Sequence, residues 1–239
     1  MTATHLWLIR HGESIANIAA TTAEREGSET VAVDIRDADV PLSASGADQA
    51  RALGAWVAER HRVDAIWSSP YRRARETIGI ALDEAGMAHT VRLDERLRDR
   101  ELGILDLLTR HGVAARHPEE AARRKHLGKY YHRPPGGESW ADVALRLRSF
   151  LRDAPLAERS TVIVAHDAVT MLLVALLLGW DEETLLDFAA EHTVLNASVT
   201  HLERADGAWR LTAFADVAHL QLEDAPVTAH PGSSDVVPQ

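Results

Sequence analysis

Cysteine is absent from all 239 residues of the chain. Disulfide bonds, thiolate catalysis and cysteine-based zinc or iron–sulfur sites are therefore excluded. The longest apolar run, residues 168–178, is interrupted by Thr170 and is far shorter than the roughly 20 residues that cross a bilayer. The first residues lack the basic and apolar parts of a secretion signal. We therefore expect a cytoplasmic protein that does not interact with a membrane.

Positive charge is also scarce. The 26 Lys and Arg residues are outnumbered by 36 Asp and Glu residues, which gives a formal net charge of −10. This balance argues against a protein that coats nucleic acid, so any bound anion must meet a local cationic site. Apolar residues make up 46% of the chain, which is enough for a buried core. The sequence leaves the oligomeric state open, a homodimer being one option.

Short β-rich segments alternate with longer segments of helical period, as in folds whose parallel strands are connected by helices. Strands are expected at residues 5–9, 64–69, 90–93 and 161–165, with a final hairpin over 198–214. Helices are expected from residue 14 to about 20, from 43 to about 59, and at 71–85, 138–153 and 168–178, with a surface loop over 21–39. The pattern predicts an α/β three-layer sandwich with a mostly parallel central sheet flanked by helices.

We expect a single domain over residues 1–223, with an insertion at about 104–137 that forms a helical lid. Residues 224–239 are rich in Pro, Gly and Ser and are expected to be a disordered tail. The lid segment 104–133 carries seven Arg and Lys against three acidic residues, a local net charge of +4. Its basic side chains either hold a second anionic group of a substrate or form a solvated helix face.

Side chains that can bind an anion follow three of the expected strands. Arg10 and His11 come after the first strand, Arg73 after the second, and His166 after strand 161–165. Because the carboxyl ends of parallel strands meet at one edge of a sheet, we expect these side chains to converge. Guanidinium groups match phosphoryl oxygens, and a neutral imidazole can attack phosphorus. The pattern therefore predicts a phosphoryl-transfer site.

An ordered series of motifs over residues 5–203 supports this prediction. They are Leu8-Ile9-Arg10-His11-Gly12-Glu13-Ser14 with Asn17, Asp39-Val40-Pro41-Leu42-Ser43, Ser68-Ser69-Pro70-Tyr71-Arg72-Arg73-Ala74 with Thr77, Leu97-Arg98-Asp99 with Gly103, Pro135-Gly136-Gly137-Glu138-Ser139, and Val162-Ile163-Val164-Ala165-His166. The series resembles that of the histidine phosphatase superfamily, the phosphoglycerate-mutase-like proteins, and is far more specific than a single short motif.

The resemblance implies a role for each catalytic candidate. It implies that His11 becomes phosphohistidine, that Arg10 and Arg73 clamp the phosphoryl oxygens, and that His166 stabilises the charge on that group. Asp99 lies where the family carries its acid/base carboxylate. No metal or other cofactor is implied, because arginines and histidines supply the charge stabilisation.

Two candidate site positions depart from the family pattern, and so do residues 104–106, which lack the aromatic and acidic-glycine sequence common after the family's Gly. The family usually has Glu where this chain has Asp99, and Glu101, two residues later, is the alternative acid/base. Asp167 replaces a residue that is most often Gly, and its carboxylate either keeps His166 charged or repels the substrate. We expect Asp167 and Glu101, together with Asn17 and Gly12, to contribute to substrate binding.

The predicted function is metal-independent hydrolysis of a small phosphorylated metabolite by a phosphohistidine mechanism. One alternative is phosphoryl transfer of the phosphoglycerate-mutase type, which the lack of the mutase's extended motif after the acid/base residue disfavours. The other is a relative that binds phosphorylated ligands without catalysis. The remaining eleven of the 13 histidines lack metal-ligand spacing and are expected at the surface. The sequence does not identify the substrate.

Overall fold

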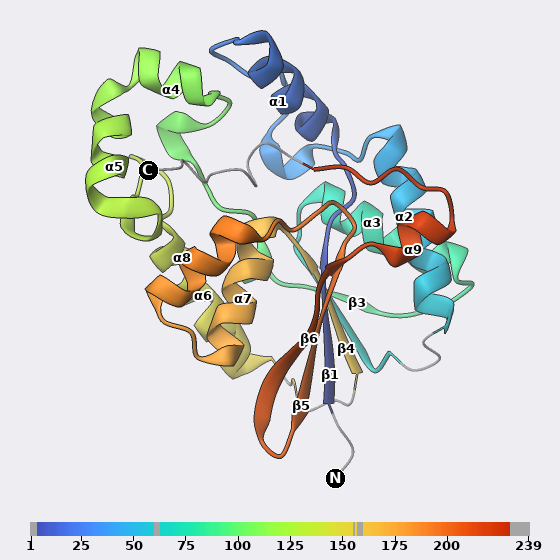
Figure 1. Cartoon of the computed structure of the whole chain (residues 1–239). Helices are drawn as coiled ribbons and strands as arrows, with labels where there is room; N and C mark the ends of the chain where they lie inside the picture. Colours follow the sequence, from blue (N-terminus) through green and yellow to red (C-terminus); the bar gives the residue numbers. More distant parts are fainter. Residues whose placement is uncertain (1–3, 60–62, 155, 157–159, 230–239) are drawn as a thin grey trace.

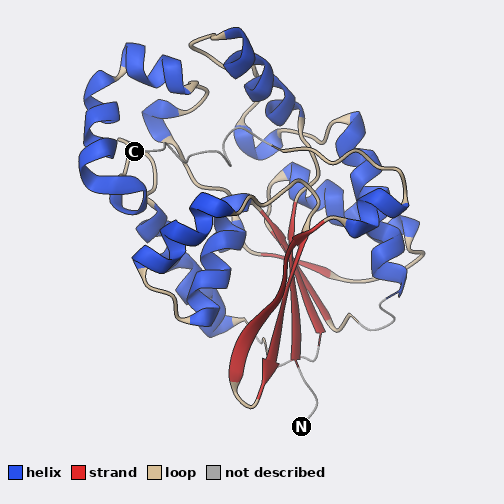
Figure 2. Ribbon diagram, viewed as in Figure 1, coloured by secondary structure: helices blue, strands red, loops and turns tan. Residues whose placement is uncertain are grey.

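A six-stranded sheet with the strand order β3-β2-β4-β1-β5-β6 forms the centre of the structure (Figure 2). This structure, a computed structural model, describes residues 4–59, 63–154, 156 and 160–229. The strands are β1 Thr4–Arg10, β2 Ala65–Ser68, β3 Val91–Leu93, β4 Ser160–Ala165, β5 Val199–Ala205 and β6 Ala208–Asp216. The first four are parallel, and β5 and β6 run antiparallel at one edge. The predicted mostly parallel sheet is confirmed.

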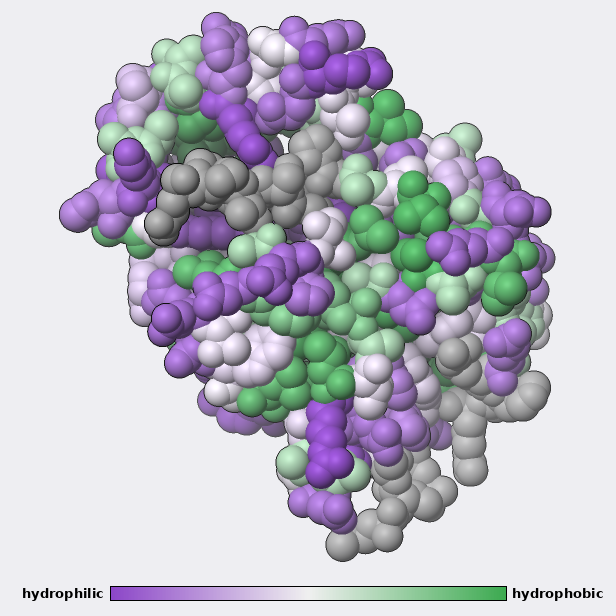
Figure 3. Space-filling view, viewed as in Figure 1, coloured by the Kyte–Doolittle hydropathy of each residue, from purple (hydrophilic) through white to green (hydrophobic). Residues whose placement is uncertain are grey.

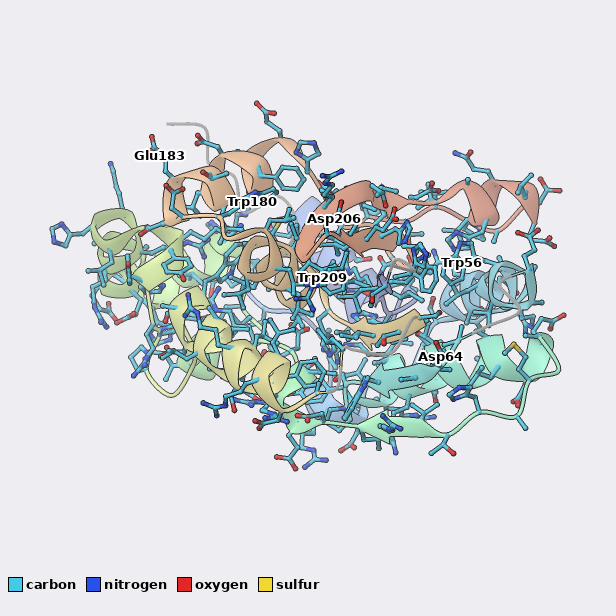
Figure 4. The ribbon with its side chains drawn as sticks, turned by 90° about the horizontal axis from the view of Figure 1, so that it is seen from below. Trp56, Asp64, Trp180, Glu183, Asp206 and Trp209 are labelled. Carbon is cyan, nitrogen blue, oxygen red and sulfur yellow. The ribbon has the colours of Figure 1, made fainter. Side chains whose placement is uncertain are left out.

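Helices cover both faces of the sheet (Figure 1). They are α1 Ile15–Glu26, α2 Ala44–Glu59, α3 Arg72–Glu84, α4 Arg110–Arg116, α5 Pro118–Tyr131, α6 Trp140–Asp153, α7 Asp167–Leu178, α8 Glu182–Glu191 and α9 Ala218–Leu222, with 3-10 turns at Asp37–Asp39, Glu95–Leu97 and Gly103–Leu105. Seen from below, the layer containing α2 and Trp56 lies on the opposite side of the sheet from the α7–α8 layer and Trp180 (Figure 4). The predicted three-layer arrangement is confirmed.

The central strand β4 is buried on both faces, and its side chains alternate between two cores. Ile163 belongs to the core under α6 and α7, whereas Val162 and Val164 belong to the core under α2 and α3. Helix α7 is correspondingly apolar, but no helix within the described ranges has both the length and the apolarity that crossing a membrane requires.

Helix α1 is longer than the sequence predicts, because it continues to Glu26 through part of the expected loop. A capping box of Ser14 and Asn17 begins the helix, and Gly27, at φ 67°, ends it. The prediction was wrong here because the segment has little apolar periodicity and is held by its two caps. Helices α8 and α9 were also not predicted.

The lid consists of α4 and α5, and backbone hydrogen bonds attach it to the loop after α1. The Thr109 amide donates to the Glu29 carbonyl at 3.1 Å, and the Val31 amide donates to the Leu107 carbonyl at 2.8 Å. A Cβ on Gly112 would lie 1.9 Å from the same Glu29 oxygen, so this close approach requires glycine. The segment predicted to form a helical lid is therefore tied to the loop that follows α1.

Residues 224–229 pack against the domain, although the sequence predicts that the disordered tail begins at 224. The Gln49 side chain donates to the carbonyl of Pro226 at 2.7 Å, and the Asn196 amide donates to the Thr228 carbonyl at 3.2 Å. Composition did not indicate this because the segment is held mainly by hydrogen bonds to Gln49 and Asn196, with Ala225 as its apolar contact. The remaining part of the predicted tail, 230–239, lies outside the described residues.

Candidate active site

The strand order places three loops side by side at the carboxyl edge of the sheet. Strand β4 lies between β1 and β2, so His166, which follows β4, is flanked by His11 and Ser69. The amide of His11 donates to the Ala165 carbonyl at 3.0 Å, and the amide of Ser69 donates to the Val164 carbonyl at 2.9 Å. These bonds extend the sheet by one residue and bring the rings of His11 and His166 to a centroid distance of 5.1 Å.

Two buried guanidinium groups border the histidine pair. Arg73 lies in the first turn of α3 and donates from Nε to His11 Nε2 at 3.2 Å. Arg10, the last residue of β1, is only 1% exposed and donates to the carbonyl of Val194. Because guanidinium groups stay charged when buried, the centre holds two fixed positive charges.

His11 is held as a neutral imidazole whose unprotonated Nε2 faces Arg73. Its Nδ1 lies 2.7 Å from the Gly12 carbonyl, which can only accept, so Nδ1 carries the proton. Nε2 is then the acceptor of the Arg73 hydrogen bond. Burial and the nearby charges of Arg73, His166 and Arg10 lower the pKa of His11 well below its usual value. The geometry thus produces a potential nucleophile at Nε2.

His166 lies next to Asp99 and is completely buried. Its Nε2 is 2.9 Å from Ser69 Oγ, and its Nδ1 is 3.2 Å from Asp99 Oδ2. The same Asp99 oxygen accepts from Arg73 Nη2 at 2.9 Å. Burial raises the pKa of Asp99, but His166 and Arg73 outweigh this effect and lower it well below the usual range. Asp99 is therefore a carboxylate held by two of the phosphate-binding candidates.

Glu101, the alternative acid/base candidate, is positioned by an aromatic side chain. Its Oε1 accepts from the Tyr71 hydroxyl at 2.9 Å. The Tyr71 ring in turn lies 5.0 Å from the Arg73 guanidinium and 5.3 Å from the His166 ring. Glu101 lines the cavity beside Asp99, but Asp99 is the carboxylate that contacts Arg73 and His166.

Of the other expected binding residues, Asn17 and Asp167 line the cavity and Gly12 does not. Asn17 lines the cavity, and its Oδ1 serves the α1 cap, so its Nδ2 is the atom that can donate to a ligand. Asp167 also lines the cavity, but its Oδ1 accepts from the Ala168 amide, and the carboxylate that faces His166 is Asp99. The expectation that Asp167 keeps His166 charged is therefore not supported.

Gly12 is not among the described residues that line the cavity. Its amide donates to Thr77 Oγ1 at 3.0 Å, so this donor already has a protein partner. A Cβ at this position would lie 2.7 Å from the Gly46 carbonyl. Gly12 thus allows α2 to approach the loop after β1, and the structure gives no contact that would make it a substrate ligand.

A cavity of about 350 Å³ extends from these residues toward the lid. Its walls come from α1, the loop after β3, the lid and the starts of α6 and α7. Apolar lining residues include Val31, Leu105, Leu107, Leu108, Val113 and Met171. This space exceeds what a phosphoryl group alone occupies, so it can accommodate the organic part of a phosphate ester.

Some of the basic lid residues face this cavity and others do not. Arg124 and Lys129 line it, and Lys129 Nζ lies 4.4 Å from the centre of the Trp140 ring. Arg123 instead pairs with Glu120, and Arg133 pairs with Asp142. The lid therefore presents cationic groups to the cavity as well as to neighbouring acids. In Figure 3, hydrophilic side chains cover much of the outer surface of the lid and α1.

The expectation that the remaining histidines are at the surface was wrong for His132 and His219, which are 1% and 6% exposed. His132 is buried because its Nε2 pairs with Glu120 Oε2 at 3.0 Å, inside the lid. A lone histidine in a helical segment carries no sequence signal of such a partner twelve residues away.

His11, Asp99 and His166 could also be considered as metal ligands, since one ligand atom from each lies within 4.8 Å of the others. Two observations argue against a cation at this point. Arg73 donates from Nε to His11 and from Nη2 to Asp99, so a fixed cation already lies within hydrogen-bond distance of two of the three ligands and would repel a metal ion. The charge of Arg10 and Arg73 also favours an anion. The residues fit a phosphoryl group better than a metal ion.

Sequence reasoning missed three residues around Arg73 and His166. Ser69 and Tyr71 were quoted only as parts of a motif, which could have indicated their proximity to the site. Asp37, whose carboxylate and backbone carbonyl both accept from Arg73, lies in the segment expected to be a surface loop. No local pattern distinguishes Asp37 from the neighbouring Asp34 and Asp39.

Comparison with known proteins agrees with the resemblance found in the sequence motifs. A family model described as the histidine phosphatase superfamily (branch 1) matches residues 6–217. The chain is 28% identical over 195 residues to a 6-phosphofructo-2-kinase/fructose-2,6-bisphosphatase of Gallus gallus, covering 80% of this chain and 36% of that protein. The chain thus spans about a third of the length of that relative.

Two further relatives align over most of their own length. A 2,3-bisphosphoglycerate-dependent phosphoglycerate mutase of Methylobacterium radiotolerans is 29% identical over 206 residues, covering 82% of this chain and 91% of that protein. The solved structure of a mycobacterial glucosyl-3-phosphoglycerate phosphatase superimposes with a TM-score of 0.70 at 29% identity, covering 90% of this chain and 100% of that one.

Proposed function

The chain belongs to the histidine phosphatase superfamily (branch 1), and from this premise we propose that it is a metal-independent phosphomonoesterase that hydrolyses a small phosphorylated metabolite. The observation that carries the proposal is the neutral His11, whose Nε2 accepts from Arg73 within a pocket that also contains Arg10, Asp99 and His166. This arrangement supplies a nucleophile and the cations for one phosphoryl group.

In the first step, the Nε2 lone pair of His11 forms a bond to phosphorus while the bond from phosphorus to the ester oxygen breaks. The side chains of Arg10 and Arg73 bind the phosphoryl oxygens, so charge that builds up there meets fixed cations. A phosphoryl oxygen takes the place of Asp99 Oδ2 at Arg73 Nη2 and His166 Nδ1. Asp99 is thereby displaced toward the leaving oxygen.

Asp99 acts as the acid in this step and as the base in the next. Asp99 is a carboxylate in the free protein, and it takes up a proton from solvent when the phosphoryl group replaces its contacts with Arg73 and His166. It then protonates the leaving oxygen, which departs as a neutral alcohol. Water then forms a bond to phosphorus, the bond to Nε2 breaks, and Asp99 takes the proton of the water. Inorganic phosphate leaves, and His11 regains its lone pair. The steps sum to the hydrolysis of a phosphomonoester.

The proposal is tested with p-nitrophenyl phosphate and radiolabelled substrate. We expect phosphate release by the wild type and trapping of label on His11 after an alkaline quench, because phosphohistidine is stable to alkali and labile to acid. Both should be lost with His11→Ala. Activity should persist after EDTA treatment, because arginines and histidines supply the charge. Absence of both phosphate release and label from the wild type would instead favour a relative that only binds phosphorylated ligands.

A mutase remains the second candidate because of the similarity to a phosphoglycerate mutase over 91% of that protein. Both reactions use the same phosphohistidine and differ in whether water or a bound hydroxyl accepts the group. Product analysis with a phosphoglycerate separates them. Free phosphate as the main product supports the phosphatase, and the isomeric phosphoglycerate supports the mutase.

The organic part of the substrate extends toward the lid in this proposal. The solved relative is named for a phosphatase of glucosyl-3-phosphoglycerate, and a comparable substrate here would reach Arg124 and Lys129 on the cavity wall. We propose that these two side chains bind a second anionic group of the substrate.

A further inference from the structure

Arg73 uses two different edges of its guanidinium group. The side edge, formed by Nε and Nη2, faces the reaction centre, where Nε donates to His11 Nε2 at 3.2 Å and Nη2 to Asp99 Oδ2 at 2.9 Å. The end edge, formed by Nη1 and Nη2, faces Asp37, whose Oδ1 and Oδ2 lie at 2.8 and 3.3 Å. The planar guanidinium is thus held from two sides at once.

Asp37 reaches this buried cation from the surface. It begins the 3-10 turn Asp37–Asp39, and its backbone carbonyl also accepts from Arg73 Nη1, at 2.7 Å. The Asp37 side chain is 41% exposed, whereas that of Arg73 is 5% exposed. A loop between α1 and α2 therefore provides three acceptor atoms to one catalytic guanidinium on α3.

The two edges have different consequences for phosphoryl binding. In the proposed reaction Asp99 leaves Arg73 when the phosphoryl group arrives, so the side edge exchanges its partner. Asp37 binds the opposite part of the guanidinium and can stay in place throughout. It is then the fixed contact that keeps the plane of the Arg73 guanidinium aimed at His11 while the partners on the other edge change.

We propose that Asp37 is a positioning residue, which holds the end edge of Arg73 so that Nε and Nη2 face the phosphoryl group. The inference rests on the proposed function. The negative charge of Asp37 also compensates the buried Arg73 cation from the side away from His11. At that place the Asp37 carboxylate does not occupy the phosphoryl position. Asp39, in the same turn, pairs instead with the exposed Arg36 and provides a matched control.

The first test measures inorganic phosphate binding by calorimetry together with hydrolysis of p-nitrophenyl phosphate. Asp37→Ala should weaken phosphate binding and lower kcat/KM, each by about 10-fold, because small errors in the orientation of a catalytic group are costly. Asp37→Asn keeps one side-chain acceptor and should fall between Asp37→Ala and the wild type. Asp39→Ala should match the wild type in both measurements.

The opposite result is also informative. If Asp37 competed with the phosphoryl group for Arg73, Asp37→Ala would bind phosphate more tightly, and this outcome would overturn the proposal. Unchanged binding and kcat/KM would do the same. Failure of the wild type to bind phosphate or to hydrolyse the ester would refute the proposed function itself, which distinguishes the two failures.

A double-mutant cycle separates positioning from a general structural effect. Lysine cannot present a planar fork, so in an Arg73→Lys background the Asp37→Ala change should alter phosphate binding by less than about 2-fold. An equal loss in both backgrounds would mean that Asp37 does not act through Arg73, and the proposal would fail. Thermal unfolding of each variant identifies any loss that arises from the fold.

Discussion

Asp99 contacts two groups that a bound phosphoryl group would also contact, Arg73 Nη2 and His166 Nδ1. In the free protein these neighbours lower its pKa, so it is ionised and cannot donate a proton. Entry of an anion removes both contacts and adds a negative charge nearby, and both changes raise the pKa of a carboxyl group. In the proposed reaction, substrate binding converts Asp99 into a general acid, and we expect this binding to be accompanied by uptake of a proton.

The role of Asp99 can be separated from that of Glu101 by the leaving group. With a phosphate ester of an aliphatic alcohol, Asp99→Asn should lower kcat/KM by about 100-fold or more, because the departing alkoxide needs a proton. With p-nitrophenyl phosphate the loss should be much smaller, because p-nitrophenolate leaves without full protonation. Glu101→Gln should affect both substrates alike, by no more than a few-fold.

Equal losses on both esters for Asp99→Asn would show that Asp99 serves binding and not proton transfer. A leaving-group dependence seen with Glu101→Gln, and not with Asp99→Asn, would transfer the acid/base role to Glu101. Steady-state kinetics with the two esters at one pH is sufficient for either conclusion.

At the scale of elements, the loop that carries Asp99 is held by the segment that precedes α6. Glu138 accepts from Arg98 and from Arg146, and Arg146 also donates to the Asp99 carbonyl at 3.1 Å. The Ile104 amide donates to the Pro135 carbonyl at 3.0 Å. Glu138 thus holds the loop that carries Asp99, in addition to its favourable position near the start of α6.

Gly103 packs directly against the backbone of the segment that precedes α6. Its φ is +57°, and a Cβ there would lie 2.1 Å from the Pro135 carbonyl oxygen. Gly103→Ala should therefore separate the loops, displace Asp99 and lower kcat/KM by about 10-fold or more, as expected for a misplaced catalytic group. The variant is assayed with the aliphatic phosphate ester, for which Asp99 matters most.

Gly86 gives the matched control for Gly103. It has a similar φ of +63°, but nothing lies within 4 Å of its added Cβ. Gly86→Ala should introduce backbone strain without a steric clash. The free energy of unfolding should therefore fall by about 1 kcal/mol, while kcat/KM stays near the wild-type value. Comparable activity losses in both variants would contradict the argument from loop contact.

The basic lid residues allow a test of the proposed binding of a second anionic group. Arg124 lines the cavity, while the adjacent Arg123 pairs with Glu120. Arg124→Glu should lower kcat/KM for 3-phosphoglycerate relative to p-nitrophenyl phosphate by about 10-fold, because reversing a contact charge penalises an anionic ligand. Arg123→Glu should leave that ratio near the wild-type value.

If the two lid variants changed the ratio equally, the basic residues would act as a solvated helix face, the other reading of this segment. Repeating the assays at several salt concentrations adds a second measure. The dependence on ionic strength should weaken with Arg124→Glu if the contact is electrostatic.

The sequence predicted the central strands and the convergence at their ends, because continuous apolar runs and strand-end motifs are local signals. It also identified His11, Arg73 and Asp99 as site candidates through motif order. It did not predict α8, the extension of α1 or the contact from Asp37 to Arg73. These depend on capping geometry or on partners far apart in the chain, for which a single sequence carries no local pattern.

At the scale of the whole molecule, the site places two histidines, His11 and His166, in the interior. Burial is the largest cause that lowers the pKa of His11 and of His166 below the usual value of 6.5. In the unfolded chain both rings regain ordinary pKa values and bind protons below pH 6.5. The unfolded state then binds more protons than the folded state, so acidification favours unfolding.

The free energy of unfolding should therefore begin to fall as the pH drops below about 6.5, by up to about 1.4 kcal/mol per pH unit for each histidine. The fall continues until the pH reaches the pKa of the folded state. Thermal or urea unfolding at pH 7.5 and at pH 5.5 measures the difference.

His11→Gln removes one titrating ring, so the stability of this variant should depend less on pH over this interval. His126→Gln alters an exposed lid residue and should retain the wild-type dependence. A wild-type stability that is the same at both pH values would mean that the two rings are protonated equally in the folded and unfolded chains, and the neutral state assigned to the His11 nucleophile would then be wrong.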